Sequence, residues 1–177
     1  MKVLIGTDHA GFELKELLKS FIIELGHEVV DKGAFEFYKD DNYPEFIIPT
    51  AQAVADANDK NTVGIVIGGS GQGEAMAANR VRGIRATTFY GPRPPSRAVD
   101  VTGRQSADEY EMINLSRSHN AANVLALGTR FISDEEAKTA VKLWLGSDAK
   151  TSDRYMKRID QVEDMAMPDL SDAREIS

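Results

Sequence analysis

Short apolar runs alternate along the chain with longer stretches in which apolar residues recur every three or four positions. The short runs are rich in residue types typical of strands, and they predict strands at residues 2–7, 27–31, 62–68, 83–89 and 123–128. The longer stretches have the helical period and predict helices at residues 12–26, 44–57, 74–81 and 133–146, with a last charged helix at about 152–165. Strand and helix therefore follow one another in regular order.

This alternation favours a parallel sheet, because consecutive parallel strands need a crossover connection, usually a helix. Residues 62–68 (TVGIVIG) are apolar at nearly every position, as expected of a strand that is covered on both faces. The sequence thus predicts an α/β fold: a three-layer α/β/α sandwich with a five-stranded parallel, Rossmann-like sheet and a C-terminal tail helix. Ligands of such sheets bind beyond the carboxyl ends of the strands, so we expect the residues that follow each strand to form the ligand site.

One segment does not follow the rhythm. Residues 90–111 contain three prolines and three arginines with weak periodicity. A loop of this length is uncommon in a compact domain and usually functional, so we expect a lid or pocket wall, the alternative being an exposed insertion without a role. We interpret residues 1–177 as a single domain with this insertion and with a loose tail at about 167–177.

Charge and composition exclude several classes of partner. The chain has 28 acidic and 21 basic residues and a formal net charge of −7, which disfavours binding to nucleic acid and to anionic membranes. No apolar run approaches the roughly 18 residues of a membrane span. The first residues meet an acid at Asp8 and are not expected to be a signal peptide. Cysteine is absent, which fits a reducing, cytoplasmic location.

The turn after the third predicted strand is unusually rich in glycine. Residues 66–80 read VIGGSGQGEAMAANR, with four glycines in six positions. Backbone N–H groups in such a turn can converge on an anion at the start of a helix. It is not a Walker loop, since no Gly-Lys-Ser/Thr follows, and it is a poor dinucleotide fingerprint, since Glu74 would repel a pyrophosphate. Spacing alone leaves open whether it binds a ligand or is only a tight turn.

Glu74 is the one carboxylate in this turn. An acid in the first turn of a helix ordinarily interacts with the helix dipole, and that explanation alone would suffice. A carboxylate beside convergent N–H donors can also take a proton from carbon while the donors stabilise the enolate-type oxygen that results. The sequence therefore also supports Glu74 as a general base, with the glycines leaving room for a substrate.

Four blocks of the sequence, in this order, resemble the RpiB/LacAB family of sugar-phosphate isomerases. They are residues 6–33, the Tyr-Pro pair at 43–44, residues 68–86 and residues 115–130. The family interconverts phosphorylated aldoses and ketoses through an enediol(ate). Many members have a cysteine where this chain has Ser70, and a subgroup has serine there and uses a glutamate four positions later. The resemblance is to the glutamate subgroup, so the lack of cysteine is expected.

The resemblance implies a role for each matching residue. Glu74 would shuttle a proton between C1 and C2, and Ser70 with the amides around it would bind the developing oxyanion. Asp8 and His119 match positions linked to opening of the sugar ring. The substrate-binding residues implied in the same way are His9, Tyr43, Gly69, Gly71, Gly73, Asn120, Arg130, Arg154 and Arg158.

The arginines in this set would bind the phosphate, which suits the guanidinium group chemically. For any one of them the alternative is an ordinary solvated side chain. The family pocket is shared between two subunits, so we expect a homodimer, or a tetramer built from it, in which the tail helix contributes across the interface. Two departures stand out: Tyr155 replaces a histidine of the family's tail motif and Asp153 a glycine.

The expected activity is metal-free isomerisation of ribose 5-phosphate and ribulose 5-phosphate. Three scattered histidines and no cysteine cluster argue against a dedicated transition-metal site, and no cofactor is expected. The alternatives are isomerisation of a hexose 6-phosphate or a tetrose 4-phosphate, or a non-catalytic domain that binds phosphosugars. A nucleotide or flavin binder of doubly wound type is a third possibility, which the acid at position 74 disfavours.

Overall fold

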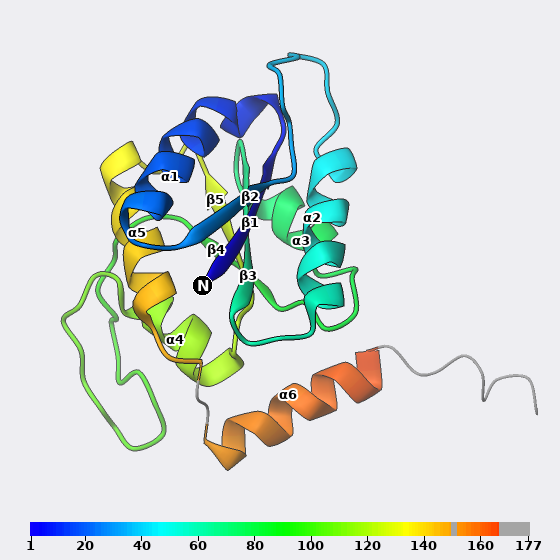
Figure 1. The fold of residues 1–177 in the computed structure, drawn as a ribbon. Coiled ribbons are helices and arrows are strands. Elements are labelled where there is room, and N and C mark those ends of the chain that lie inside the picture. The colour runs from blue at the N-terminus through cyan, green and yellow to red at the C-terminus, as the bar shows by residue number, and fades with distance from the viewer. Residues whose placement is uncertain (150–151, 167–177) are drawn as a thin grey trace, which may run out of the picture.

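A parallel sheet runs through the centre of the computed structural model, which describes residues 1–149 and 152–166 (Figure 1). Its five strands lie in the order β2-β1-β3-β5-β4, and every neighbouring pair is parallel. Their bounds are β1 Lys2–Thr7, β2 Glu28–Asp31, β3 Thr62–Gly68, β4 Ala86–Phe89 and β5 Val124–Gly128. The predicted five-stranded parallel sheet is confirmed.

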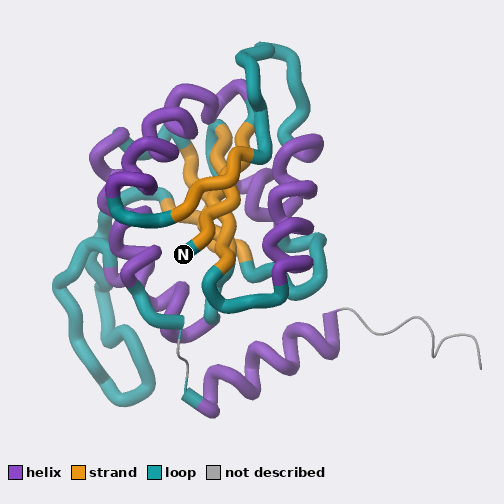
Figure 2. Tube along the Cα trace, viewed as in Figure 1, coloured by secondary structure: helices purple, strands orange, loops and turns teal. Residues whose placement is uncertain are grey.

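Helices cover both faces of this sheet (Figures 1 and 2). Their bounds are η1 His9–Gly11 (a 3₁₀ turn), α1 Phe12–Glu24, α2 Pro44–Ala57, α3 Gln72–Ala78, α4 Glu111–Asn120, α5 Asp134–Gly146 and α6 Asp153–Ala166. The apolar residues of α1, α4 and α5 pack on one face of the sheet, and those of α2 and α3 pack on the other. The result is the three-layer α/β/α sandwich that the alternating pattern predicts.

Local signals in the sequence account for several helix ends. The Ser133 hydroxyl accepts a hydrogen bond from the Glu136 amide, and the Glu136 carboxylate accepts one from the Ser133 amide, so the predicted capping box is present. Pro49 does not interrupt α2, which continues past it to Ala57. The helix after the glycine turn begins at Gln72, two residues earlier than the spacing of apolar residues predicts, because Gly71 already provides its start.

A buried cation connects α1 to the end of β2. Lys15 is fully buried, and its Nζ lies 2.8 Å from both carboxylate oxygens of Asp31. Lys15 also donates to the carbonyl oxygen of Ala34, at the start of the loop that leads to α2. Burial alone would raise the pKa of Asp31, but hydrogen bonds from Lys15, Lys19 and the Gly33 amide outweigh it and lower that pKa. This network fixes the base of the 32–43 loop.

Trp144 of α5 lies wholly inside the core, as predicted from its place in an apolar stripe. The Arg117 guanidinium of α4 lies over its ring, with Cζ 4.9 Å from the ring centroid. Arg117 is itself buried and donates to the carbonyl oxygen of Ala122. The contact packs α4 against α5.

The segment 90–111 leaves β4 and projects from the body of the molecule beside α4 (Figure 1). Arg104 contacts Glu111, in the first turn of α4, with Nη2 2.6 Å from Oε1, and the Ser106 hydroxyl donates to the other oxygen of that carboxylate. The loop is thus anchored to α4, and its role as a lid stays a prediction. The predicted tail at 167–177 lies outside the described residues. Among the helices of the described residues, none has both the length and the apolarity needed to cross a membrane.

Candidate active site

Three loops meet beyond the carboxyl ends of the central strands. Asp8 follows β1, the glycine turn follows β3, and Arg130 follows β5. Hydrogen bonds link these loops directly: the Thr129 amide donates to Gly68, the Arg130 amide to Gly69, and the Thr129 hydroxyl to Ala10. Adjacent parallel strands therefore bring together residues that are more than 120 positions apart, at the edge where such sheets bind ligands.

The glycine turn is packed too closely for side chains. Gly71 has φ +73°, a left-handed conformation that favours glycine. A Cβ at Gly73 would stand 3.1 Å from the Tyr43 ring, and one at Gly69 would stand 3.1 Å from the Arg130 guanidinium carbon. Tyr43 and Arg130 therefore lie directly against the turn. Ser70 is partly buried, and its hydroxyl accepts from the Gln72 amide at 3.3 Å.

Glu74 is buried, with 5% of its surface exposed, and its Oε2 has no hydrogen-bond partner within the described residues. A Cβ at Gly68 would overlap the other side of this carboxylate. Burial raises the pKa of Glu74, and the nearby charge of Asp8 raises it further, while the backbone amides of Glu74 and Gly71 oppose the shift. A carboxylate with a raised pKa in a confined space is suited to exchange protons with a substrate.

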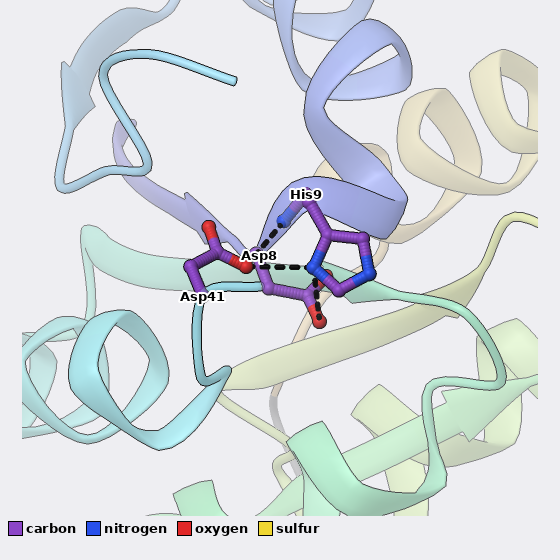
Figure 3. A group of neighbouring side chains, drawn as sticks. All are labelled: Asp8, His9 and Asp41. Atoms are coloured by element: carbon purple, nitrogen blue, oxygen red, sulfur yellow. Dashed lines mark hydrogen bonds and ion pairs between the residues drawn. The ribbon is translucent and has the colours of Figure 1, made fainter. Parts of the chain in front are cut away.

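Asp8, His9 and Asp41 form a compact group beside this turn (Figure 3). Asp8 caps the 3₁₀ turn, with Oδ1 accepting from the Ala10 amide at 3.0 Å, so the capping role that its position allows is real. Asp41 Oδ1 accepts from the His9 backbone amide at 3.0 Å and lies 2.7 Å from His9 Nδ1. Asp41 was not among the predicted site residues, since nothing in the sequence links it to a histidine 32 positions earlier.

This group is the one set of three or more His and acidic side chains within the described residues whose ligand atoms come near enough for a metal ion. Its geometry is that of a hydrogen-bonded pair. Asp41 Oδ1 and His9 Nδ1 lie 2.7 Å apart, which is ordinary for a shared proton. A zinc ion coordinated by both atoms would instead lie between them at about 2.0–2.2 Å from each.

The remaining predicted residues lie at the opposite edge of the sheet. His119 and Asn120 end α4, just before β5 begins, and Arg85, just before β4, donates to the Asn120 carbonyl oxygen. The tail helix α6 lies beyond this amino edge (Figure 1), where the Tyr155 ring stacks on His119 with centroids 4.1 Å apart. The Arg158 guanidinium carbon lies 5.8 Å from the Tyr155 ring.

One chain therefore holds two separate groups of predicted residues. Asp8, His9, Tyr43, the glycine turn with Ser70 and Glu74, and Arg130 meet at the carboxyl edge, whereas His119, Asn120, Arg154 and Arg158 gather at the amino edge. Strand β5, of 5 residues, separates the two groups by on the order of 15 Å at about 3.3 Å per residue. Within one chain, His119 does not meet Asp8 or Glu74.

Comparison with known proteins agrees with the resemblance seen in the sequence. The sequence model of the ribose/galactose isomerase family matches residues 3–99 and 105–162, so that only residues 100–104 of the long loop fall between the two matched parts. A ribose-5-phosphate isomerase B of Escherichia coli is 36% identical over 161 residues, covering 91% of this chain and 93% of its own. One from Mycolicibacterium paratuberculosis is 35% identical over 160 residues, covering 90% and 88%.

Solved structures give the same result. The ribose-5-phosphate isomerase B of Mycoplasma genitalium, crystallised with bound ribulose 5-phosphate, matches with a TM-score of 0.79 and 30% identity over 93% of this chain and 95% of the other. The enzyme of Clostridium thermocellum matches with a TM-score of 0.78 and 32% identity, covering 94% and 97%.

Proposed function

Because the chain belongs to the ribose/galactose isomerase family, we propose that it interconverts ribose 5-phosphate and ribulose 5-phosphate through an enediol(ate). The observation that carries this proposal is Glu74: a buried carboxylate with a raised pKa, set in a turn of glycines at the ligand-binding edge of the sheet. The bound ribulose 5-phosphate of the Mycoplasma genitalium relative supports the choice of substrate.

In the proposed reaction the open-chain aldose lies with C2 near Glu74. The Glu74 carboxylate takes the proton from C2, and the electron pair moves toward the C1 carbonyl to form the enediolate. Ser70 and the amides of the turn stabilise the negative O1 oxygen. The proton of the O2 hydroxyl passes to O1, and Glu74 returns its proton to C1, which leaves the ketone at C2. The raised pKa of Glu74, which burial causes, helps both the removal and the return of the proton, because it brings the acid and base forms of this side chain closer in free energy at neutral pH.

Opening of the sugar ring and binding of the phosphate need residues from both edges. We propose that a second copy of the chain supplies His119, Asn120, Arg154 and Arg158 to each site, while Asp8, His9 and Arg130 come from the first. The separation of these groups within one chain supports a homodimer with shared sites, since neither group is a complete site alone. A tetramer would be two such dimers.

We also propose a cytoplasmic location, which the absence of cysteine in the sequence supports. The net charge of −7 disfavours a nucleic-acid or anionic-membrane partner, and local arginines would have to hold a phosphate substrate against it.

The test is an assay of the purified chain against pentose, hexose and tetrose phosphates with a chelator present. In D₂O, isomerisation through an enediolate incorporates deuterium at C1 or C2, which distinguishes proton transfer from hydride transfer. Isomerisation of ribose 5-phosphate that persists with chelator is the expected result. Preference for a hexose or tetrose phosphate would correct the substrate, and binding without turnover would identify a phosphosugar-binding domain.

A further inference from the structure

The loop between β2 and α2 places a buried carboxylate on His9. Asp41 has a side chain that is only 7% exposed, and its Oδ1 accepts both from the backbone amide of His9 and, at 2.7 Å, from the Nδ1 side of its ring. Because Asp41 contacts both the backbone and the ring of His9, it restricts rotation of the ring about the side-chain torsions of His9. The ring cannot turn without breaking a hydrogen bond to a buried acceptor, which is costly.

The other oxygen of Asp41, Oδ2, is buried and has no hydrogen-bond partner in the part of the chain that the structure describes. A carboxylate desolvated in this way needs a nearby positive charge, and His9 is in position to provide it. The hydrogen bond from Asp41 raises the pKa of His9, burial opposes this, Asp8 adds to the rise, and the Arg130 charge counteracts it. The net direction is upward, toward a protonated ring.

The contact with Asp41 also determines which ring atom stays available. Nδ1 faces Asp41 and Asp8, and the other ring nitrogen, Nε2, points away from both carboxylates (Figure 3). The His9 side chain is 31% exposed, so this far side is open. With Nδ1 protonated and engaged, a charged ring has its second N–H on Nε2, on the side of the ring that can reach a ligand.

We propose that Asp41 is a positioning residue of the isomerase: it holds His9 so that Nε2 donates a hydrogen bond to the phosphate of the substrate beside Arg130. This inference rests on the proposed function for its substrate. His9 would touch the ligand, and Asp41 would act only through His9. The phosphate is the group in question because it is anionic before the reaction starts, whereas the enediolate oxygen is charged only during it.

A structural role for Asp41 makes different predictions, and the chain allows them to be separated. Asp41→Asn keeps the size of the side chain and an acceptor oxygen while removing the charge. Asp40→Asn, at the exposed neighbouring position, is the matched control. The chain has only three histidines, so ring titrations by two-dimensional NMR can be assigned individually with His9→Asn.

We expect the wild-type His9 ring to titrate above its ordinary value and to carry its neutral-form proton on Nδ1. In Asp41→Asn the His9 pKa should fall, while that of His27 should stay the same. KM for ribose 5-phosphate at pH 7 should rise about tenfold or more, the loss expected for a charge-assisted hydrogen bond, with kcat within about twofold. An unchanged His9 titration in Asp41→Asn, or a KM equal to that of Asp40→Asn, would overturn the proposal.

Two further measurements keep the test independent of stability and of turnover. If Asp41 acts through His9, adding Asp41→Asn to His9→Asn should raise KM no further, whereas a general loosening of the loop would add to it. Inorganic phosphate should bind more weakly to Asp41→Asn, with a larger Kd, even if the chain isomerises no sugar tested. If only the proposed reaction is wrong, the chain will isomerise no sugar, but the His9 pKa will still fall in Asp41→Asn. If the Asp41 inference is wrong, the His9 pKa will be the same in the wild type and in Asp41→Asn.

Discussion

The Glu74 carboxylate occupies the space that a Cβ on Gly68 would need. Gly68 is the last residue of β3, and Glu74 lies six residues later in the first turn of α3, so the strand end forms one wall around the candidate base. Gly68→Ala would have to displace the carboxylate, because neither the strand nor its neighbours can move freely. A base displaced by about 1 Å can lose on the order of 10²-fold in rate.

We therefore expect Gly68→Ala to lower kcat by about 10²-fold while leaving a folded protein. Gly146→Ala is the control, since a Cβ there would meet no atom within 4 Å. Steady-state kinetics and circular dichroism of the two variants decide the matter. Wild-type kcat in Gly68→Ala would mean that the position of Glu74 is not critical to the reaction.

Glu74→Gln should separate activity from stability. The reaction should slow by about 10²–10⁴-fold, as is typical when a general base is removed. The folded protein should nevertheless become more stable at pH 7, because the substitution replaces a buried charge with a neutral group of the same size.

The sign of this effect follows from the raised pKa of Glu74 in the fold. Folding favours the protonated form, and that contribution is complete below the unfolded-state pKa of about 4.5 and is lost as pH rises through the higher folded-state pKa. Melting temperatures from pH 4 to pH 8 should show the advantage of Glu74→Gln growing with pH. A wild type that is the more stable protein at pH 7 would show that burial of this carboxylate is not costly.

Shared sites predict rescue between two inactive chains. Glu74→Gln lacks the base, and the double variant Arg154→Ala/Arg158→Ala lacks the tail arginines of the amino-edge group. In a mixed dimer one site receives both defects and the other neither, so a randomly mixed sample should recover roughly a quarter of wild-type activity. Native mass spectrometry must confirm that mixed dimers form. Mixed dimers without activity would place all site residues in one chain.

Asp31→Asn should destabilise the fold strongly. It leaves the Lys15 ammonium buried without its main carboxylate, and removing one partner of a buried ion pair costs about 3–5 kcal/mol. Glu16→Gln is the control, since the Glu16 carboxylate also contacts Lys15, at 3.2 Å, but is largely exposed, and should cost about 1 kcal/mol or less. Urea unfolding at pH 7 measures both.

The pH dependence gives this prediction a second check. Hydrogen bonds from the two lysines keep the pKa of Asp31 below its ordinary value, so its contribution is present above the unfolded-state pKa and is lost as pH falls toward the folded-state value. The gap between wild type and Asp31→Asn should therefore shrink in acid. Equal unfolding free energies at pH 7 would show that Ala34 and Glu16 are sufficient partners for Lys15.

The sequence was most informative where periodicity fixes geometry. Alternating strands and helices determine that Asp8, Glu74 and Arg130 emerge at one edge of the sheet, and the structure places them there. The same rule could have placed His119 at the opposite edge, because it precedes a strand instead of following one. The family resemblance links His119 and Asp8 to the same step, opening of the sugar ring. Two residues can act in one step even when they come from different chains.

Asp41 could not have been found in this way. The 32–43 loop has no period that fixes which way its side chains point, and the bonds to His9 depend on how the loop folds back over β1. The Tyr155–His119 stack is similar: α6 is amphipathic, but the pattern alone does not say which helix end it covers.

Trp144 is the only tryptophan in the sequence, and its indole Nε1 is buried without a hydrogen-bond partner in the described part of the chain. The molecule therefore has a single indole fluorophore, which can be excited selectively over the tyrosines, and its surroundings are buried and apolar except for the guanidinium over its face. Its emission should be strongly blue-shifted and should move to the red when α5 separates from the sheet. Substrate binding at the carboxyl edge should leave the spectrum nearly unchanged, so one optical signal reports unfolding separately from catalysis.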